Sequence, residues 1–234
     1  MRFSIKGAII LSMSHGEQSF DKKYYRRFFD DYSKNEFNKY VNWSYGWLKF
    51  LDRYVNIKKG SGRSLHELGS SLGYFAKAFK DRGFEVSGSD ISSYIVKKAG
   101  EVQKDIKFFK LNIESNLKIN KKYDFIVAFE VLEHLNSPEK ALLNVKKMLN
   151  KNGILIFSTP FPTKRSLGDP THINVHQEKW WLSLGKKAGY SKTKLIHATF
   201  LPFVYRFSKY LSLGLPIKTN IPYINSTVFF IFKK

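Results

Sequence analysis

From Ser64 onward the sequence alternates short apolar runs with amphipathic segments. The apolar runs are at 65–68, 84–88, 106–111, 123–129 and 153–158, and helix-like spacing occupies about 72–82, 92–101 and 137–149. A further helix near 177–188 precedes strands at about 192–199 and 226–232. Strands that alternate with helices indicate a parallel sheet with helices on both faces. The sequence therefore predicts an α/β fold with seven strands.

The segment before this alternation is rich in aromatic residues. Residues 19–58 show helical spacing in two stretches, one with Phe28, Phe29 and Tyr32 and one that begins at Trp43. We expect an N-terminal helical cap over the sheet's carboxyl edge, followed by one domain over 60–234. Residues 1–18 are expected to be a loosely ordered leader. They begin like a signal peptide, but the apolar run is short and no cleavage site is clear, and Met13 is an alternative start.

The charge of the chain is strongly positive. Forty Lys and Arg stand against 19 acidic residues, and ten basic residues but no acidic one follow Glu178. This charge can attract nucleic acid, an anionic membrane or a phosphorylated small molecule. Codon bias explains the positive charge equally well, because the Lys excess is accompanied by many Asn and Ile residues. No apolar run approaches the about 18 residues of a membrane span, so a cytoplasmic protein is expected. The absence of Cys excludes disulfides and thiolate metal sites.

A glycine loop follows the first strand of the alternating region. Residues 67–73 read Glu-Leu-Gly-Ser-Ser-Leu-Gly, and glycines at such a bend let a ligand approach the backbone closely. Asp90 ends the next strand, where a carboxylate can accept hydrogen bonds from both hydroxyls of a ribose. Together these features predict a nucleoside site, although a tight turn with an incidental Asp has the same spacing.

The loop argues against a dinucleotide. Glu67 repels a pyrophosphate, and the third glycine of G-x-G-x-x-G is missing. A carboxylate at this position suits a ligand with an amino group and a sulfonium, which favours S-adenosylmethionine.

Residues 65–92 and 125–162 resemble the class I S-adenosylmethionine-dependent methyltransferases, and the likeness extends over about 60–234. It implies a Rossmann-like, mostly parallel, doubly wound sheet of seven strands with the last strand antiparallel. It also implies cofactor contacts, which are Glu67, Gly69, Ser71 and Gly73 at the methionine part, Asp90 at the ribose, Ile91, Asn112 and Ile113 at the adenine, and Phe129 near the sulfonium. Two residues depart from the family pattern, because Ser71 replaces a usual Gly and Asn112 a common Asp.

A second group of polar residues follows the fourth strand. Glu130, Glu133 and His134 are spaced to share one face of a helical turn. They resemble the metal-binding pattern of ubiquinone-biosynthesis O-methyltransferases and of small-RNA 2′-O-methyltransferases. In the RNA enzymes a later His completes the site, for which His172 is the first candidate and His176 the second. Three interpretations remain open: a divalent cation on Glu130, Glu133, His134 and His172, a metal-free base at His134 or His172, or a helix start without chemistry.

The segment 201–225, between the last two strands, is apolar, aromatic and basic. It is compatible with a lid, a peripheral membrane contact or ordinary packing. Trp180 and Trp181 are expected to anchor their helix. We expect O-methylation of a small or lipid-linked acceptor, such as a sugar or quinol hydroxyl. The alternatives are an RNA 2′-O-methyltransferase, for which no RNA-binding module is recognised, and an inactive cofactor-binding partner subunit.

Overall fold

The structure is a computed structural model that describes residues 20–26, 34–201, 208, 210–211, 213–219 and 225–234. Its strands are β1 (Ser64–Leu68), β2 (Glu85–Asp90), β3 (Lys107–Lys110), β4 (Tyr123–Phe129), β5 (Leu149–Thr159), β6 (Lys192–Phe200), β7 (Gly214–Leu215) and β8 (Asn225–Lys233). Its helices are α1 (Lys22–Arg26), α2 (Lys34–Leu51), α3 (Tyr74–Lys80), α4 (Ser93–Val102), the short 3₁₀ turn η2 (Leu132–His134), α5 (Pro138–Met148), α6 (Lys164–Leu167) and α7 (Glu178–Lys187).

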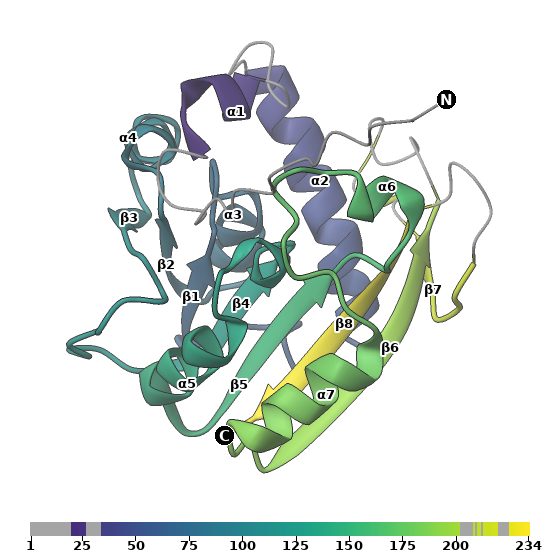
Figure 1. The fold of residues 1–234 in the computed structure, drawn as a ribbon. Helices are drawn as coiled ribbons and strands as arrows, with labels where there is room; N and C mark the ends of the chain where they lie inside the picture. Colours follow the sequence, from purple (N-terminus) through teal and green to yellow (C-terminus); the bar gives the residue numbers. More distant parts are fainter. Residues whose placement is uncertain (1–19, 27–33, 202–207, 209, 212, 220–224) are drawn as a thin grey trace, which may run out of the picture.

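All the described strands form one sheet in the order β3-β2-β1-β4-β5-β8-β6-β7 (Figure 1). Neighbours from β3 to β5 pair in parallel, and β8 runs antiparallel between β5 and β6. The predicted α/β class, the mostly parallel sheet and the antiparallel last strand are therefore confirmed. The carboxyl ends of β1, β2, β4 and β5 meet at one edge of the sheet, the edge where open α/β sheets bind ligands.

The sheet has eight strands instead of the predicted seven. The additional strand is β7, whose two residues pair with Thr199 and Phe200 at the end of β6. Two residues are too few to show a strand period in a sequence. β7 lies inside 201–225, and the greater part of the rest of that segment lies outside the described residues.

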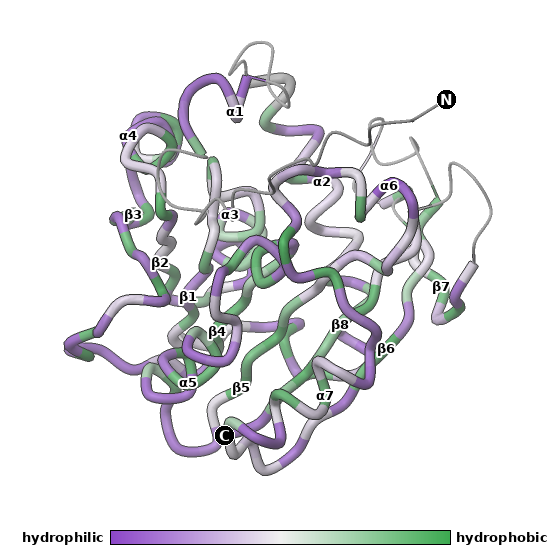
Figure 2. Tube along the Cα trace, in the orientation of Figure 1, coloured by the Kyte–Doolittle hydropathy of each residue, from purple (hydrophilic) through white to green (hydrophobic). Residues whose placement is uncertain are grey.

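The two faces of the sheet are buried against different helices. Along β4, Ile126 and Ala128 pack with α5 and α7, whereas Phe125 and Val127 pack with α2 and α3. A strand buried on both faces reads as a continuous apolar run, which explains the sequence 123–129. Figure 2 shows such hydrophobic stretches along the central strands.

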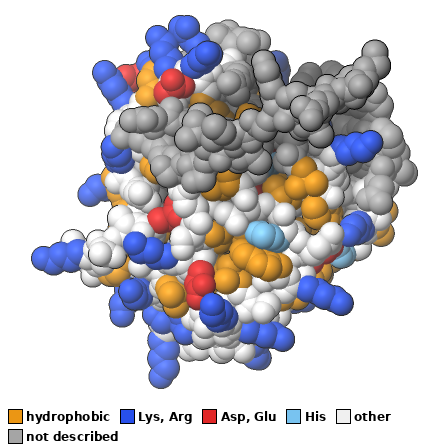
Figure 3. Space-filling view, viewed as in Figure 1, with side chains coloured by type: hydrophobic (Ala, Val, Ile, Leu, Met, Phe, Trp, Pro, Cys, Tyr) orange, Lys and Arg blue, Asp and Glu red, His pale blue; other side chains and the backbone are white. Residues whose placement is uncertain are grey.

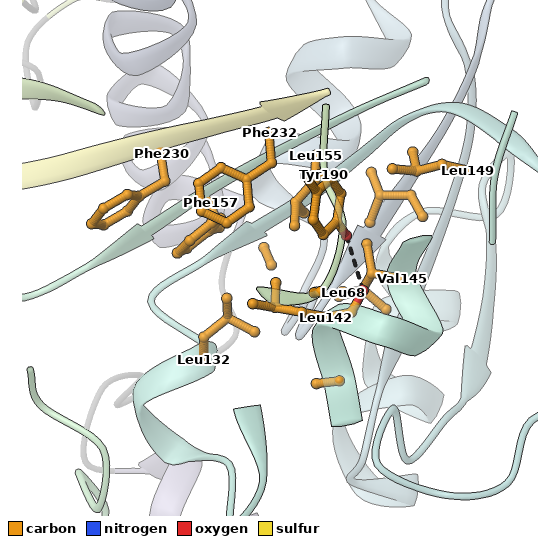
Figure 4. Close-up of a cluster of buried hydrophobic side chains, with 14 of the residues drawn as sticks. Leu68, Leu132, Leu142, Val145, Leu149, Leu155, Phe157, Tyr190, Phe230 and Phe232 are labelled. Carbon is orange, nitrogen blue, oxygen red and sulfur yellow. Dashed lines mark hydrogen bonds between the residues drawn. The ribbon is translucent and has the colours of Figure 1, made fainter. Parts of the chain in front are cut away.

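Aliphatic and aromatic side chains together fill the layer between the sheet and α5 and α7 (Figure 4). Phe157 of β5 stacks on Phe230 of β8, with ring centroids 4.7 Å apart. The Tyr190 hydroxyl donates to the backbone oxygen of Leu142 at 3.0 Å, so this buried polar group has a partner. The order of β5 and β8 is thus held by side chains as well as by the ladder.

In Figure 1, α1 lies above the carboxyl edge of the sheet, and α2 runs from there across the face that it covers together with α3. Trp47 of α2 packs on Phe75, Phe129, Phe200 and Phe229. The expected leader at 1–18 lies outside the described residues, as do Phe28, Phe29 and Tyr32. None of the described helices is both long and apolar enough to cross a bilayer.

Candidate active site

The loop after β1 has the backbone that its glycines predict. Gly69, Ser71 and Gly73 have φ values of +62°, +48° and +78°, in the left-handed region. A Cβ on Gly69 would lie 2.4 Å from Cγ2 of Val131, so only Gly fits against the loop that follows β4. The two loops therefore approach each other closely at the edge of the sheet.

Glu67 holds the start of the next helix. Its Oε2 accepts a hydrogen bond from the backbone N–H of Ala76 at 2.8 Å. Burial raises the pKa of this carboxyl well above its usual range, and the Ala76 bond opposes that shift. Glu67 thus presents a polar group to the site while it ties β1 to α3.

Asp90, at the end of β2, joins three segments. Its Oδ2 accepts from the Ser71 N–H at 3.1 Å, and its Oδ1 accepts from the Ser92 N–H at 3.0 Å and the Tyr25 hydroxyl at 3.1 Å. Burial raises its pKa, opposed by these hydrogen bonds. The partner on α1, Tyr25, was not identified from the sequence, where it is one aromatic residue among many.

These elements enclose a cavity of about 410 Å³. The predicted residues that line it are Glu67, Gly69, Ser71, Asp90, Ile91, Asn112, Ile113, Phe129, Glu130 and His134. Gly73 is not part of the lining, because it packs against Gln103 and Phe108, where a Cβ would lie 2.4 Å from Gln103 Nε2 and 2.5 Å from the Phe108 ring. The described lining holds four carboxylates and no Lys or Arg. Such a wall suits a cationic or neutral ligand and disfavours a pyrophosphate.

Aromatic side chains from the N-terminal segment complete the wall. Phe20, Tyr24, Tyr25, Tyr40 and Trp43 all line the cavity. Aromatic faces attract cations, so such a wall suits a sulfonium. The aromatic content of 19–58 was a signal for these residues, but their spacing alone could not indicate which rings turn toward the cavity.

Glu133, His134 and His172 come together beside the cavity. One potential ligand atom from each lies within 4.8 Å of the others, and the two imidazole rings are 4.7 Å apart. Both carboxylate oxygens of Glu133 are buried without a hydrogen-bond partner among the described residues. Burial, reinforced by Glu130, raises the Glu133 pKa well above its usual range. A buried carboxylate of this kind is a candidate ligand for a cation.

The tautomers of the two histidines follow from their partners. His134 Nδ1 lies 2.9 Å from the backbone oxygen of Thr171, and His172 Nδ1 lies 2.9 Å from that of Ser166. A carbonyl oxygen only accepts, so a neutral ring in this position carries its proton on Nδ1 and its lone pair on Nε2. A lone pair on Nε2 is what a base or a metal ligand requires.

Two other predicted polar residues, Glu130 and His176, are not part of this cluster of potential ligand atoms. The Glu130 carboxylate accepts from the Ser158 hydroxyl at 2.6 Å and the Thr227 hydroxyl at 3.3 Å. His176 stacks on Trp180 at 3.7 Å and bonds Asn174. The cluster therefore includes three of the four predicted metal ligands, with His172 as the later His. Trp181 is fully buried, whereas Trp180 is at the surface.

Comparisons with known proteins show the family of the chain. The family described as "Methyltransferase domain" matches residues 37–195. Ubiquinone biosynthesis O-methyltransferases are similar over part of the chain, at 27% identity over 116 residues in Coxiella burnetii and 30% over 115 residues in Rickettsia canadensis. These matches cover 48% and 47% of this chain. They cover the same shares of the two relatives, so the chain spans about half the length of these curated relatives.

Solved structures share the fold at low identity. A SAM-dependent methyltransferase from Archaeoglobus fulgidus is 19% identical with a TM-score of 0.63, covering 92% of this chain and 100% of that one. The magnesium protoporphyrin IX methyltransferase of Synechocystis, solved with bound SAH, is 16% identical with a TM-score of 0.61, covering 93% and 98%. The family match covers more than half of the chain, so the chain belongs to the methyltransferase-domain family.

Proposed function

We propose that this protein is an S-adenosylmethionine-dependent enzyme that methylates a hydroxyl group of a small or lipid-linked acceptor, of the sugar or quinol type. The observation that carries the proposal is the cluster of Glu133, His134 and His172, of which His134 lines the cavity. An alcohol needs a base or a cation to lose its proton, whereas an amine needs only alignment. The names of the curated relatives, which are O-methyltransferases, support the same acceptor atom.

The cofactor contacts are proposed as follows. Asp90 accepts hydrogen bonds from the ribose hydroxyls, and Phe129 borders the sulfonium. The methionine part is bordered by Glu67, Gly69, Ser71 and Gly73. The adenine is bordered by Ile91, Asn112 and Ile113. All of these except Gly73 line the cavity, which supports the assignment. Asn112 Oδ1 already accepts from the Glu114 N–H at 2.9 Å, so its amide group is what remains for a ligand.

In the proposed mechanism His134 accepts the acceptor's proton at Nε2. Its Nδ1 partner, the Thr171 oxygen, keeps the ring in the required tautomer and orientation. The cofactor supplies the methyl group, and the cavity walls align acceptor and sulfonium for in-line transfer. The half-buried His134 lies against Phe20 at 5.5 Å, and this aromatic contact shields the base from water.

A divalent cation on the same three residues is the alternative to the His134 base, because an Nε2 lone pair that binds a cation cannot also accept a proton. Glu133 offers a buried oxygen without a partner, and the two histidines offer Nε2 lone pairs. When bound, such an ion lowers the pKa of a hydroxyl that it contacts. Glu130 is not proposed as a ligand, because it is not part of the cluster of Glu133, His134 and His172 and its Oε1 already accepts from Ser158 and Thr227.

The experiment measures methyl transfer from labelled S-adenosylmethionine to a catechol-type quinol and to a sugar. We expect His134→Gln to lower kcat/KM by roughly 10² to 10⁴-fold, the usual contribution of a positioned base. The affinity for S-adenosylmethionine should stay within about twofold, because His134 is not proposed to hold the cofactor. His197→Gln, on β6 and outside the cluster, is the matched control and should keep the wild-type rate.

Metal use is tested by calorimetry with Mn²⁺ or Mg²⁺ alone. The cation proposal predicts binding to the wild-type protein that Glu133→Gln and His172→Gln remove. Transfer only to nitrogen would rule out the proposed O-methylation, and an active His134→Gln variant would rule out His134 as the base. Methylation of RNA with a steep salt dependence would favour the RNA alternative. The described cavity wall without Lys or Arg and the scattered Lys and Arg in Figure 3 count against RNA.

A further inference from the structure

Asp90, the residue proposed to bind the ribose of the cofactor, already has a full set of hydrogen-bond donors. The backbone N–H groups of Ser71 and Ser92 and the Tyr25 hydroxyl donate to its two oxygens at 3.0 to 3.1 Å. A hydrogen bond from the Ile91 N–H also lowers the Asp90 pKa. A carboxylate offers about four lone-pair positions. A ribose hydroxyl therefore has to replace one of these donors.

Tyr25 is the donor that is displaced most readily. The Ser92 N–H lies two residues after Asp90, and the Ser71 N–H lies in the loop between β1 and α3, so the edge of the sheet fixes both. Tyr25 comes instead from α1, a helix of five residues outside the sheet. Its side chain is buried, so water does not compete for its hydrogen bond. A shift of α1 therefore makes a position on Asp90 available and leaves the strands and the loop in place.

Residues 20–25 are tied together in one turn. The Tyr24 N–H donates to Oδ1 of Asp21 at 2.9 Å, and the Tyr25 N–H donates to the Asp21 backbone oxygen at 3.2 Å. The ring centroids of Phe20 and Tyr24 are 4.9 Å apart, and those of Tyr24 and Tyr25 are 5.1 Å apart. We call Phe20, Tyr24 and Tyr25 the aromatic latch. Because backbone and ring contacts join its members, a shift of Tyr25 also moves Phe20.

The other end of the aromatic latch lies against the proposed base. The ring of Phe20 meets the His134 ring edge-on, with centroids 5.5 Å apart. Burial raises the pKa of Tyr24 to about 12, and a hydrogen bond with the Thr171 side chain opposes this shift. The Thr171 backbone oxygen is also the partner of His134 Nδ1. The latch therefore contacts both Asp90 and the residues around the base.

We propose that Tyr25 competes with the ribose of the cofactor for Asp90, and that displacement of Tyr25 moves the aromatic latch away from His134. The inference rests on the proposed function, in which Asp90 binds the ribose. While Tyr25 donates to Asp90, Phe20 covers His134 and keeps water from the base. Once the ribose donates to Asp90, the latch no longer covers His134, and the acceptor can reach the base. The enzyme should therefore bind the cofactor first and the acceptor second.

Calorimetry with S-adenosylhomocysteine, the demethylated cofactor, tests the competition. Tyr25→Phe keeps the ring but cannot donate to Asp90. We expect this variant to bind S-adenosylhomocysteine about tenfold more tightly than the wild type, because a hydrogen bond to a charged acceptor no longer has to be broken. The matched control is Tyr190→Phe, which removes another buried hydroxyl, one that donates to Leu142 outside the cavity lining. It should bind like the wild type.

Chemical modification of His134 tests the movement of the latch. Diethyl pyrocarbonate acylates accessible imidazoles, and mass spectrometry of the full chain after digestion gives the rate at each histidine. S-adenosylhomocysteine should raise the rate at His134 of the wild type several-fold, because the displaced latch uncovers the ring. Tyr25→Phe should react faster than the wild type even without S-adenosylhomocysteine. His176, which stacks on Trp180 outside the cluster, is the internal reference and should keep its rate.

A Tyr25→Phe variant that unfolds cooperatively but binds S-adenosylhomocysteine no more tightly than the wild type overturns the competition. An unchanged or lower rate at His134 of the ligand-bound wild type overturns the movement, and this measurement needs no variant.

Asp90→Asn separates this inference from the proposed function. If Asp90→Asn binds S-adenosylhomocysteine as tightly as the wild type, the proposed ribose contact is wrong. If Asp90→Asn binds it more weakly while Tyr25→Phe binds it no more tightly, only the competition is wrong.

Discussion

At the scale of single residues, Ser71 is the departure from the family pattern that most affects the cofactor site. Its φ of +48° is a conformation that favours glycine, and its hydroxyl oxygen is buried without a partner among the described residues. A left-handed conformation costs a non-glycine residue about 1–2 kcal/mol, and an unpaired buried polar group costs a similar amount. The chain therefore keeps a residue at the site that lowers its stability.

Ser71→Gly should raise the free energy of unfolding by about 1 kcal/mol, after the greater flexibility of glycine in the unfolded chain is subtracted. Urea unfolding measures the change. Ser61→Gly is the control, because Ser61 also has a positive φ of +51° but is exposed. A gain at residue 71 no larger than at residue 61 would show that the buried hydroxyl costs nothing.

His66 provides a prediction about pH. It is fully buried in β1 between the hydroxyls of Ser87 and Ser89, both at 2.9 Å. Burial, with a smaller effect of Lys121, lowers its pKa to about 3, whereas the unfolded chain titrates near 6.5. Between these values the unfolded state binds more protons, so stability is full above about pH 6.5 and falls as the pH falls toward 3.

In the His66→Gln variant, the decrease in the free energy of unfolding between about pH 6.5 and 3 should be smaller by a few kcal/mol. Urea unfolding of the variant and the wild type over this range gives the difference. Above pH 7 the two curves should run parallel, since neither side chain titrates there. Equal slopes in the acid range would show that His66 does not contribute to acid sensitivity.

At the scale of elements, two helical glycines test how packing outweighs helix propensity. A Cβ on Gly185 of α7 would lie 2.3 Å from the Phe232 ring, whereas a Cβ on Gly100 of α4 would meet no described atom within 4 Å. Ala is favoured over Gly in a helix by about 1 kcal/mol, and overpacking a core costs about 1–3 kcal/mol.

Gly185→Ala should therefore destabilise the protein by about 1–2 kcal/mol despite the better helix former. Gly100→Ala should stabilise it by about 0.5–1 kcal/mol. Thermal unfolding of both variants shows whether each substitution raises or lowers the stability of the protein. A stabilised Gly185→Ala variant would mean that α7 can move away from β8.

Long periodic elements were predictable from the sequence, and their boundaries agree closely. The predicted strand 123–129 is β4, and the predicted helix 137–149 is α5, Pro138–Met148. Pro138 at the first helical position and apolar residues at helical spacing are local signals. β7 carried no such signal, since its pairing with β6 depends on residues that lie far apart in the chain.

At the scale of the whole molecule, ligand binding links the cavity to global stability. A ligand that binds only the folded state raises the free energy of unfolding, by about 2.7 kcal/mol at a hundredfold excess over its Kd. S-adenosylmethionine should produce such a shift. NAD should not, because the described cavity wall has no Lys or Arg and contains Glu67.

Thermal unfolding with each compound measures the two shifts. Asp90→Asn should weaken S-adenosylmethionine binding about tenfold or more, because a charged acceptor of two hydroxyl hydrogen bonds is lost. Thr193→Ser, on the distant start of β6, should keep the wild-type shift. Stabilisation by NAD instead would contradict the assignment of the cavity.

The α/β order, the glycine loop and the place of Asp90 at the next strand end were predictable from the amino-acid sequence, because each depends on neighbours within a few residues or one strand–helix unit. Only the tertiary structure decided that Glu133 joins His134 and His172 while Glu130 turns to Ser158 and Thr227. It also decided which N-terminal aromatic rings line the cavity. Such choices depend on packing between segments distant in the chain, where small differences in available space select one hydrogen-bond partner over another.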